Sequence, residues 1–350
     1  MILLLAAPAA TEAGHSAAQR GAAFAVPRPA PPLRDAVFAG PAPAAARISA
    51  TASGERYSLN DGSGDSIAVE VSAACLRECE AADPQAIANA VGTFIHGPEV
   101  NLLTVQLDTG FQLGFQCGFE ALACYFAGEN RILLDGDAEP GPDGASREFV
   151  LAHEYGHHVA AHRDVPPPFP AALDWGTERW ASVENVCRGH RRGDYFPGDQ
   201  EGRYYEDPGE AFAEAFAFNR FPGAAVKWAW TPALRPTAAS LEALRLDTLR
   251  PWRGRANFTI SGRVPRDGVV VRGFRTPHDG RVSIGPVGAP GLGYELVLLN
   301  GQGQRLRSSR QGVSQGHRLD YTVCGQSRLR LAVRATGRPG GRFELTVRRP

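Results

Sequence analysis

The stretch FVLAHEYGHHVAAH, residues 149–162, contains the pattern His-Glu-x-x-His at His153, Glu154 and His157. Residues four apart lie on one face of an α-helix, so His153 and His157 can present two imidazoles to one metal ion. Glu154 would stand beside that ion, where a carboxylate can take a proton from a water molecule that zinc has made more acidic. Gly156 costs a helix roughly 1 kcal/mol relative to alanine, which suggests tight packing at this position.

A zinc site of this kind needs a third protein ligand. In the longer pattern H-E-x-x-H-x-x-G-x-x-H the third histidine would fall at Arg163 and the glycine at Ala160, so the match fails at both positions. His162 is therefore rejected as the third ligand. His158 follows His157 directly and points about 100° away around the helix. This favours a role at the surface, at the edge of the core or in contact with a ligand over metal ligation itself.

Two acidic residues further along the chain are candidates for the third ligand. Asp174 has no supporting pattern around it, whereas Glu210 opens the helical stretch EDPGEAFAEAFA. Glu210 also fits an ordinary capping box in which Asp207 is the N-cap. However, Glu214 follows one turn later among Ala and Phe, and two acids on an apolar helix need a partner if they are buried. We therefore expect Glu210 to bind the metal and Glu214 to accept a hydrogen bond from a ligating imidazole.

Together, HEYGHH and PGEAFAEAFA resemble the gluzincin metallopeptidases, in particular the anthrax-lethal-factor-like catalytic domains with a glutamate helix of the E-x-F-A-E type. The resemblance covers about residues 55–250, but only these two helices carry specific residues. It implies a zinc-dependent peptidase in which Zn²⁺ is the cofactor. The implied zinc ligands are His153, His157 and Glu210, with Glu154 as general base and Glu214 hydrogen-bonded to a ligand.

The same resemblance implies a tyrosine shortly before the glutamate helix that donates a hydrogen bond to the developing oxyanion. The family position is occupied by Arg203, and Tyr204 and Tyr205 lie a residue or two nearer to the helix. We favour Tyr204 as the catalytic tyrosine, with Tyr205 and His190 as alternatives. Ordinary packing at the entrance of the helix explains both tyrosines equally well.

Composition divides the chain into four parts. Residues 1–13 are expected to be a signal peptide, because their apolar run has the length of the hydrophobic region of such a peptide. Residues 14–50 are expected to form an Ala/Pro-rich arm or propeptide. Residues 51–252 are expected to form an α+β zincin-like catalytic domain with a mixed sheet, an active-site helix and a glutamate helix. Residues 256–350 read as short alternating segments separated by glycine-rich turns, which predicts an all-β sandwich. This tail resembles the pre-peptidase C-terminal domains of secreted bacterial peptidases.

Local patterns predict the elements of the central domain. We expect strands over 66–75, 99–110 and 124–136, a helix from the N-cap Asp83 to Gly97, and an irregular excursion over 163–209. Further helices are predicted over 208–221 and 237–250.

The six cysteines include no C-x-x-C pair and favour disulfides in an exported chain. Cys117 and Cys124 flank a turn-like segment and could pair. Cys75 and Cys79 would share a helical face, a geometry that suits a direct bridge poorly.

The leading hypothesis is a secreted zinc metalloendopeptidase that acts on protein or peptide substrates. The zero net charge gives no reason to expect a nucleic-acid partner, and no stable membrane span is expected. A cell-surface or matrix component is considered as the ligand of the C-terminal domain. The alternatives are a non-catalytic surface-binding protein that zinc merely stabilises, and a zinc hydrolase acting on a non-peptide amide.

Overall fold

A computed structural model describes residues 36–38, 51–80, 82–119, 121–137, 146–223, 232–265, 268–287, 294–309, 318–325, 327–335 and 341–350. The expected signal peptide, residues 1–13, lies outside these residues, as does all of the arm except 36–38. The described chain is a mixed α+β structure with one mixed sheet and two antiparallel sheets.

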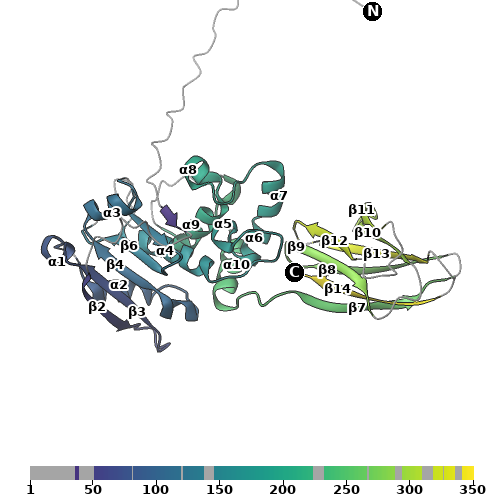
Figure 1. The fold of residues 1–350 in the computed structure, drawn as a ribbon, viewed down its shortest axis with the longest axis horizontal. Helices are drawn as coiled ribbons and strands as arrows, with labels where there is room; N and C mark the ends of the chain where they lie inside the picture. Colours follow the sequence, from purple (N-terminus) through teal and green to yellow (C-terminus); the bar gives the residue numbers. More distant parts are fainter. Residues whose placement is uncertain are drawn as a thin grey trace, which may run out of the picture. The chain divides into compact units, whose positions relative to one another are not determined.

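The mixed sheet has six strands in the order β1-β5-β6-β4-β3-β2. Figure 1 labels β6, β4, β3 and β2. Strands β3, β4 and β6 run parallel, whereas β2 and β5 are antiparallel to their neighbours β3 and β6. Strand β1 comes from the arm and pairs in parallel with the outer edge of β5. The strands are β1 (Ala36–Phe38), β2 (Thr51–Ser58), β3 (Ser66–Ser72), β4 (Thr104–Asp108), β5 (Ala123–Phe126) and β6 (Arg131–Asp135).

Most helices of this part form one hydrophobic core with the sheet, whereas α3 packs with β5 and β6 in a separate small cluster. Helix α4 packs on β5 and β6, and α9 packs on α4. The helices are α1 (Cys75–Glu78), α2 (Pro84–Val91), α3 (Gly110–Cys117), α4 (Arg147–Ala161), α5 (Ala172–Trp175), α6 (Glu178–Val183), α7 (Val186–Arg192), α8 (Gln200–Arg203), α9 (Pro208–Arg220) and α10 (Ala238–Leu249), with 3-10 turns η2 (Pro98–Leu102), η3 (Tyr204–Glu206) and η4 (Pro232–Leu234).

Several predicted boundaries need correction. Helix α2 begins at the predicted cap, where the Asp83 carboxylate accepts hydrogen bonds from two backbone N–H groups, but it ends at Gly92 and not at Gly97. The segment 124–136 is a hairpin of two strands, because Asn130 adopts a positive φ of 52° and turns the chain. The segment 163–209 contains four short helices, each too short to show a helical period in sequence.

The described residues of 256–349 contribute eight strands to two four-stranded antiparallel sheets, β11-β10-β13-β8 and β12-β9-β14-β7. The inward residues of both sheets form a second hydrophobic core. The strands are β7 (Ala256–Arg263), β8 (Val269–Thr276), β9 (Gly280–Pro286), β10 (Tyr294–Asn300), β11 (Arg305–Ser308), β12 (Leu319–Val323), β13 (Ser327–Ala335) and β14 (Arg342–Arg349).

All six cysteines form disulfides, and the predicted Cys117–Cys124 pair is one of them. The expectation that Cys75 and Cys79 would not bridge is wrong. Helix α1 is a single turn, and the backbone at Cys79 is already extended (ψ 117°), so the two Cα atoms lie 4.7 Å apart. The third disulfide joins Cys187 to Cys324, 137 residues apart.

Glu178 at the start of α6 gives a pH-dependent contribution to stability. Burial, helped by the nearby Asp247 carboxylate, raises the pKa of Glu178 from 4.5 to about 8. The folded state therefore holds this proton between these pH values while the unfolded state releases it. The contribution of Glu178 to the free energy of unfolding is therefore fully present below pH 4.5. It falls by at most about 1.4 kcal/mol per pH unit as the pH rises to about 8.

We therefore expect Glu178→Gln, which keeps the shape of a neutral carboxyl group, to remove this loss. Thermal unfolding of wild type and variant between pH 4.5 and 8 measures the effect. The melting curves should coincide near pH 4.5 and diverge as the pH rises, with the variant more stable. A constant difference across the range would contradict the assignment to Glu178.

Candidate metal centre

Helix α4 carries the His-Glu-x-x-His pattern in the core of the molecule. It starts at Ser146, whose hydroxyl accepts a hydrogen bond from the Phe149 backbone N–H at 3.2 Å. The run from Phe149 to Ala160 is buried throughout. His153, Glu154 and His157 each have no exposed surface. Polar side chains buried this deeply need partners.

Helix α9 brings two acidic residues into the same region. Asp207 is its N-cap and accepts a hydrogen bond from the Gly209 backbone N–H at 2.8 Å, and Pro208 occupies the first helical position. Glu210 and Glu214 are both buried on this helix. The Asp207 cap is formed as predicted, but the Glu210 carboxylate contacts the histidines of α4.

Gly156 allows α4 and α9 to approach each other closely, and Gly209 does the same for α9 and α5. A Cβ atom at Gly156 of α4 would lie 2.8 Å from the Ala213 Cα and 3.0 Å from the Phe216 Cβ, both on α9. A Cβ atom at Gly209 would lie 2.2 Å from the Leu173 carbonyl oxygen of α5. The tight packing expected at Gly156 is therefore confirmed, and it is the contact between the two helices that carry the site.

Three ligand atoms converge where α4 and α9 cross. The His153 and His157 Nε2 atoms lie 3.2 Å apart, and each lies 3.3 Å from the Glu210 Oε2 atom. His153, His157 and Glu210 form the one group of three or more potential metal ligands found among the residues that the structure describes. This buried His-His-Glu triad could hold a metal ion.

The electrostatics of Glu210 fit a cation at this position. Burial alone raises the pKa of its carboxyl, but the attraction of the His157 and His153 imidazoles outweighs burial and lowers the pKa. Its second oxygen, Oε1, is buried and has no hydrogen-bond partner in the described part of the chain. A buried carboxylate facing two imidazole nitrogens is a donor set that suits a divalent transition metal such as zinc.

The groups around the triad can hold the imidazoles in place. The Glu214 Oε2 atom lies 3.1 Å from the His153 Nδ1 atom, which would fix the tautomer that presents Nε2 to a metal.

Asp174 on α5 is half-buried. Burial raises the pKa of its carboxyl, and the nearby His157 imidazole acts in the opposite direction. Asp174 therefore lies beside the triad without belonging to it.

The other predicted site residues lie close to the triad in sequence. Glu154 follows His153 on α4 and is fully buried. Tyr204 and Tyr205 form the 3-10 turn η3 directly before α9, with ring centroids 5.7 Å apart. His190, the alternative to the tyrosines, is hydrogen-bonded through Nδ1 to the Tyr195 carbonyl oxygen at 3.2 Å.

The two histidines set aside in the sequence lie outside the triad. His158 lies between the Tyr125 hydroxyl, 3.0 Å from Nδ1, and the Glu99 carbonyl oxygen, 2.9 Å from Nε2. Burial lowers its pKa to about 3, so the ring is neutral at ordinary pH. His162 caps α4 and contacts the Asn130 side chain at 2.9 Å.

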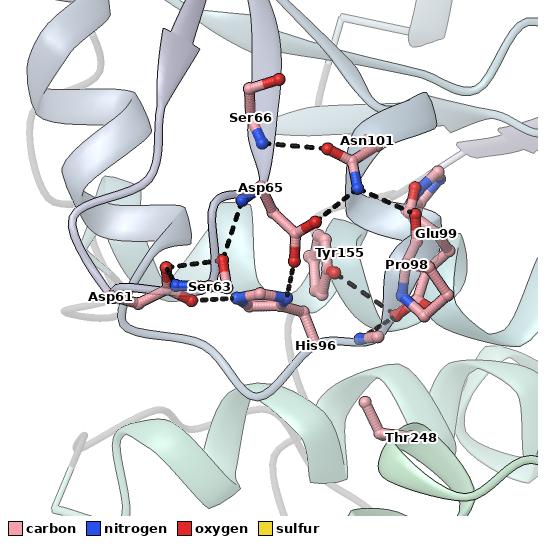
Figure 2. Close-up of polar contacts among 12 residues, drawn as sticks. Asp61, Ser63, Asp65, Ser66, His96, Pro98, Glu99, Asn101, Tyr155 and Thr248 are labelled. Atoms are coloured by element: carbon pink, nitrogen blue, oxygen red, sulfur yellow. Dashed lines mark hydrogen bonds and ion pairs between the residues drawn. The ribbon is translucent and has the colours of Figure 1, made fainter.

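Glu99 on η2, which sequence reasoning did not single out, is buried and contacts a residue of α4. Its carboxylate accepts hydrogen bonds from Tyr155 at 3.5 Å and from Arg163 at 3.0 Å (Figure 2 shows the Tyr155 contact). In the same view Asn101 joins η2 to Asp65, and His96 contacts Asp61 at 2.6 Å. The Glu99 contacts join α4 to η2, and the Asn101 contact joins η2 to the turn between β2 and β3. No sequence motif predicts these contacts.

We expect Gly156→Ala to weaken metal binding although alanine favours helix formation. The added methyl group would push α9 away from α4, at a typical overpacking cost of about 1–3 kcal/mol, and displace Glu210 from the two imidazoles. Metal affinity from competition with a chromogenic chelator measures the effect. Gly223→Ala is the control, because its Cβ atom would meet nothing within 4 Å. Unchanged affinity in the Gly156 variant would contradict this role of the close helix contact.

None of the described helices is long and apolar enough to cross a lipid bilayer. The three disulfides are typical of proteins that fold in an oxidising compartment.

No family model and no curated protein sequence matches this chain. Among solved structures, a mitogen derived from Yersinia pseudotuberculosis is similar over 27% of this chain and 87% of its own, at 9% identity and a TM-score of 0.22. Legionella pneumophila aminopeptidase A in complex with aspartic acid is similar over 83% of this chain and 35% of its own, at 12% identity and a TM-score of 0.25. Similarities this low carry no argument about fold or function.

Proposed function

We propose that this protein is a secreted zinc metallopeptidase of the gluzincin type, with a zincin-like catalytic domain. The observation that carries the proposal is the buried triad of His153, His157 and Glu210, with Glu154 next to His153 on the same helix. Structural zinc sites are closed by four protein ligands, whereas catalytic zinc sites have three. The group found here has three members, which supports catalysis over a purely structural role.

The chain's own residues would divide the chemistry of peptide hydrolysis among them. Zinc held by the triad would supply a Lewis acid that polarises a carbonyl group and lowers the pKa of water. Glu154 would accept the proton of the attacking water and pass it to the leaving amine. Glu214 would hold the His153 ring in its ligating orientation. Tyr204 would donate a hydrogen bond to the oxyanion as the amide carbonyl is attacked.

Metal removal is expected to abolish peptide hydrolysis completely and reversibly. The test is the cleavage of a panel of unstructured proteins by full-length protein, before and after treatment with dipicolinate, and after addition of zinc. Metal content by mass spectrometry accompanies each step. Activity that survives full removal of the metal would overturn the proposal.

The same experiment separates the two alternatives. A protein that zinc merely stabilises would cleave nothing at any stage, while its melting temperature would fall on metal removal. A hydrolase for non-peptide amides would leave the protein panel intact and cleave small acyl amides in a zinc-dependent way.

A further inference from the structure

The outer face of the sheet β11-β10-β13-β8 is rich in arginine. On β13 the inward residues Leu329, Leu331 and Val333 are buried in the sandwich core. Their neighbours Arg328, Arg330 and Arg334 point to the opposite face and are exposed. Because successive side chains of a strand alternate between faces, these arginines share one side of the sheet.

The strand register gathers positive charge at one end of this face. Arg328 lies directly opposite Arg275 of β8, and Arg330 lies opposite Gly273. Like charges directly opposite each other destabilise a sheet. No carboxylate of the described residues lies within ion-pair distance of Arg275, Arg328 or Arg330. These three residues are called the arginine site below.

Open hollows lie on both sides of the Arg275–Arg328 pair. One, of about 330 Å³, is lined by all three residues of the arginine site together with Gly273. The other, of about 510 Å³, is lined by Arg275, Arg328 and Arg349. Three arginines thus take part in lining each hollow. Their guanidinium groups match the geometry of carboxylate, sulfate and phosphate oxygens.

Gly273 keeps the first hollow open. A Cβ atom at this position would meet a single atom within 4 Å, the Leu329 carbonyl oxygen at 3.9 Å, so packing does not require glycine here. Glycine inside a strand weakens it and often marks a place where a ligand approaches closely. The missing side chain leaves room beside Arg275 and Arg330, at the point where the positive charges gather.

We propose that the arginine site binds an acidic polysaccharide, with its carboxylate or sulfate groups in the two hollows. Successive acidic groups of one glycan chain could enter the hollows on either side of Arg328. The charge of the site and its recessed surface favour this partner over a bilayer, whose plane would touch only the tips of the arginines. Stacking of nucleic-acid bases needs exposed aromatic rings, and the large exposed apolar residues of this face, among those described, are Val269 and Val271.

The test measures binding of the full-length protein to immobilised polygalacturonate and dextran sulfate, with neutral dextran as the blank. Arg275→Gln/Arg328→Gln is expected to weaken binding by about tenfold or more. Gly273→Leu fills a hollow without changing charge and should also weaken binding. Arg334→Gln is the matched control, because Arg334 is exposed on the same strand but lies opposite Glu295 at the far end of the face. Its binding should equal that of wild type.

Three results would overturn the proposal. The first is equal binding by wild type and the Arg275/Arg328 variant. The second is equal loss in the Arg334 control, which would show general electrostatic attraction. The third is binding to phosphatidylglycerol vesicles or DNA, lost in the same variant, with no binding to either polysaccharide. Melting temperature and zinc content of each variant verify the fold, and the outcome is independent of peptidase activity.

Discussion

Replacing Glu154 with glutamine is expected to lower the rate of peptide hydrolysis by about three orders of magnitude while zinc content stays at the wild-type level. General acid–base catalysis by a positioned side chain typically contributes about 10²–10⁴-fold. Glutamine keeps the size of the buried Glu154 side chain but cannot accept the proton of water. Because the metal group consists of His153, His157 and Glu210, the substitution leaves every ligand in place.

The measurement is turnover of an unstructured protein substrate, with metal content determined on the same samples. Glu148→Gln is the matched control, since Glu148 lies in the first turn of the same helix and is exposed. It should retain wild-type activity. Full activity of the Glu154 variant would show that another group is the general base.

Replacing Glu210 with alanine is expected to reduce zinc affinity by at least about a hundredfold. Loss of a group that only supports a ligand typically costs 10–100-fold, and Glu210 supplies one of the three converging ligand atoms. Competition with a chromogenic chelator measures the affinity, and mass spectrometry measures the zinc that remains after dialysis. Glu214→Gln alters the contact to His153 Nδ1 but leaves the three converging ligand atoms in place, so it should show a smaller loss.

Wild-type zinc occupancy in the Glu210 variant would show that Glu210 is not a zinc ligand. It would then be an ordinary acidic residue in the first turn of α9. Its helix would still begin correctly, because Asp207 provides the cap. The two experiments thus address different steps: the Glu210 variant tests metal binding, and the Glu154 variant tests proton transfer.

The sequence predicted the elements that have a strong local signal. Helix α9 carries both an N-cap and a proline at its first position, and α10 lies within the predicted range 237–250. Helix α3 was missed, because its eight residues contain two glycines and no charge. The short helices between α4 and α9 were missed for a related reason: each is stabilised by the core it packs on and not by its own periodicity.

The sequence predicted which residues form the candidate site, but not the contacts from other elements that hold these residues in place. The spacing of His153 and His157 follows from helix geometry, whereas the contact between His153 and Glu210 spans 57 residues and depends on how two helices cross. Glu99 and Asp174 come from separate elements. No local pattern indicated Glu99, and Asp174 was a candidate ligand without any supporting pattern around it. Burial and crossing geometry are properties of the whole fold.

The Cys187–Cys324 disulfide changes what proteolytic processing of this chain can achieve. It ties α7 to the turn after β12, across the connection between the two hydrophobic cores. A protease that cuts this connection, around residues 250–256, would yield two polypeptides that migrate as one species until a reductant is added. Cleavage and release are therefore separate events. In an oxidising environment the α+β part would stay joined to the two antiparallel sheets until the disulfide is reduced.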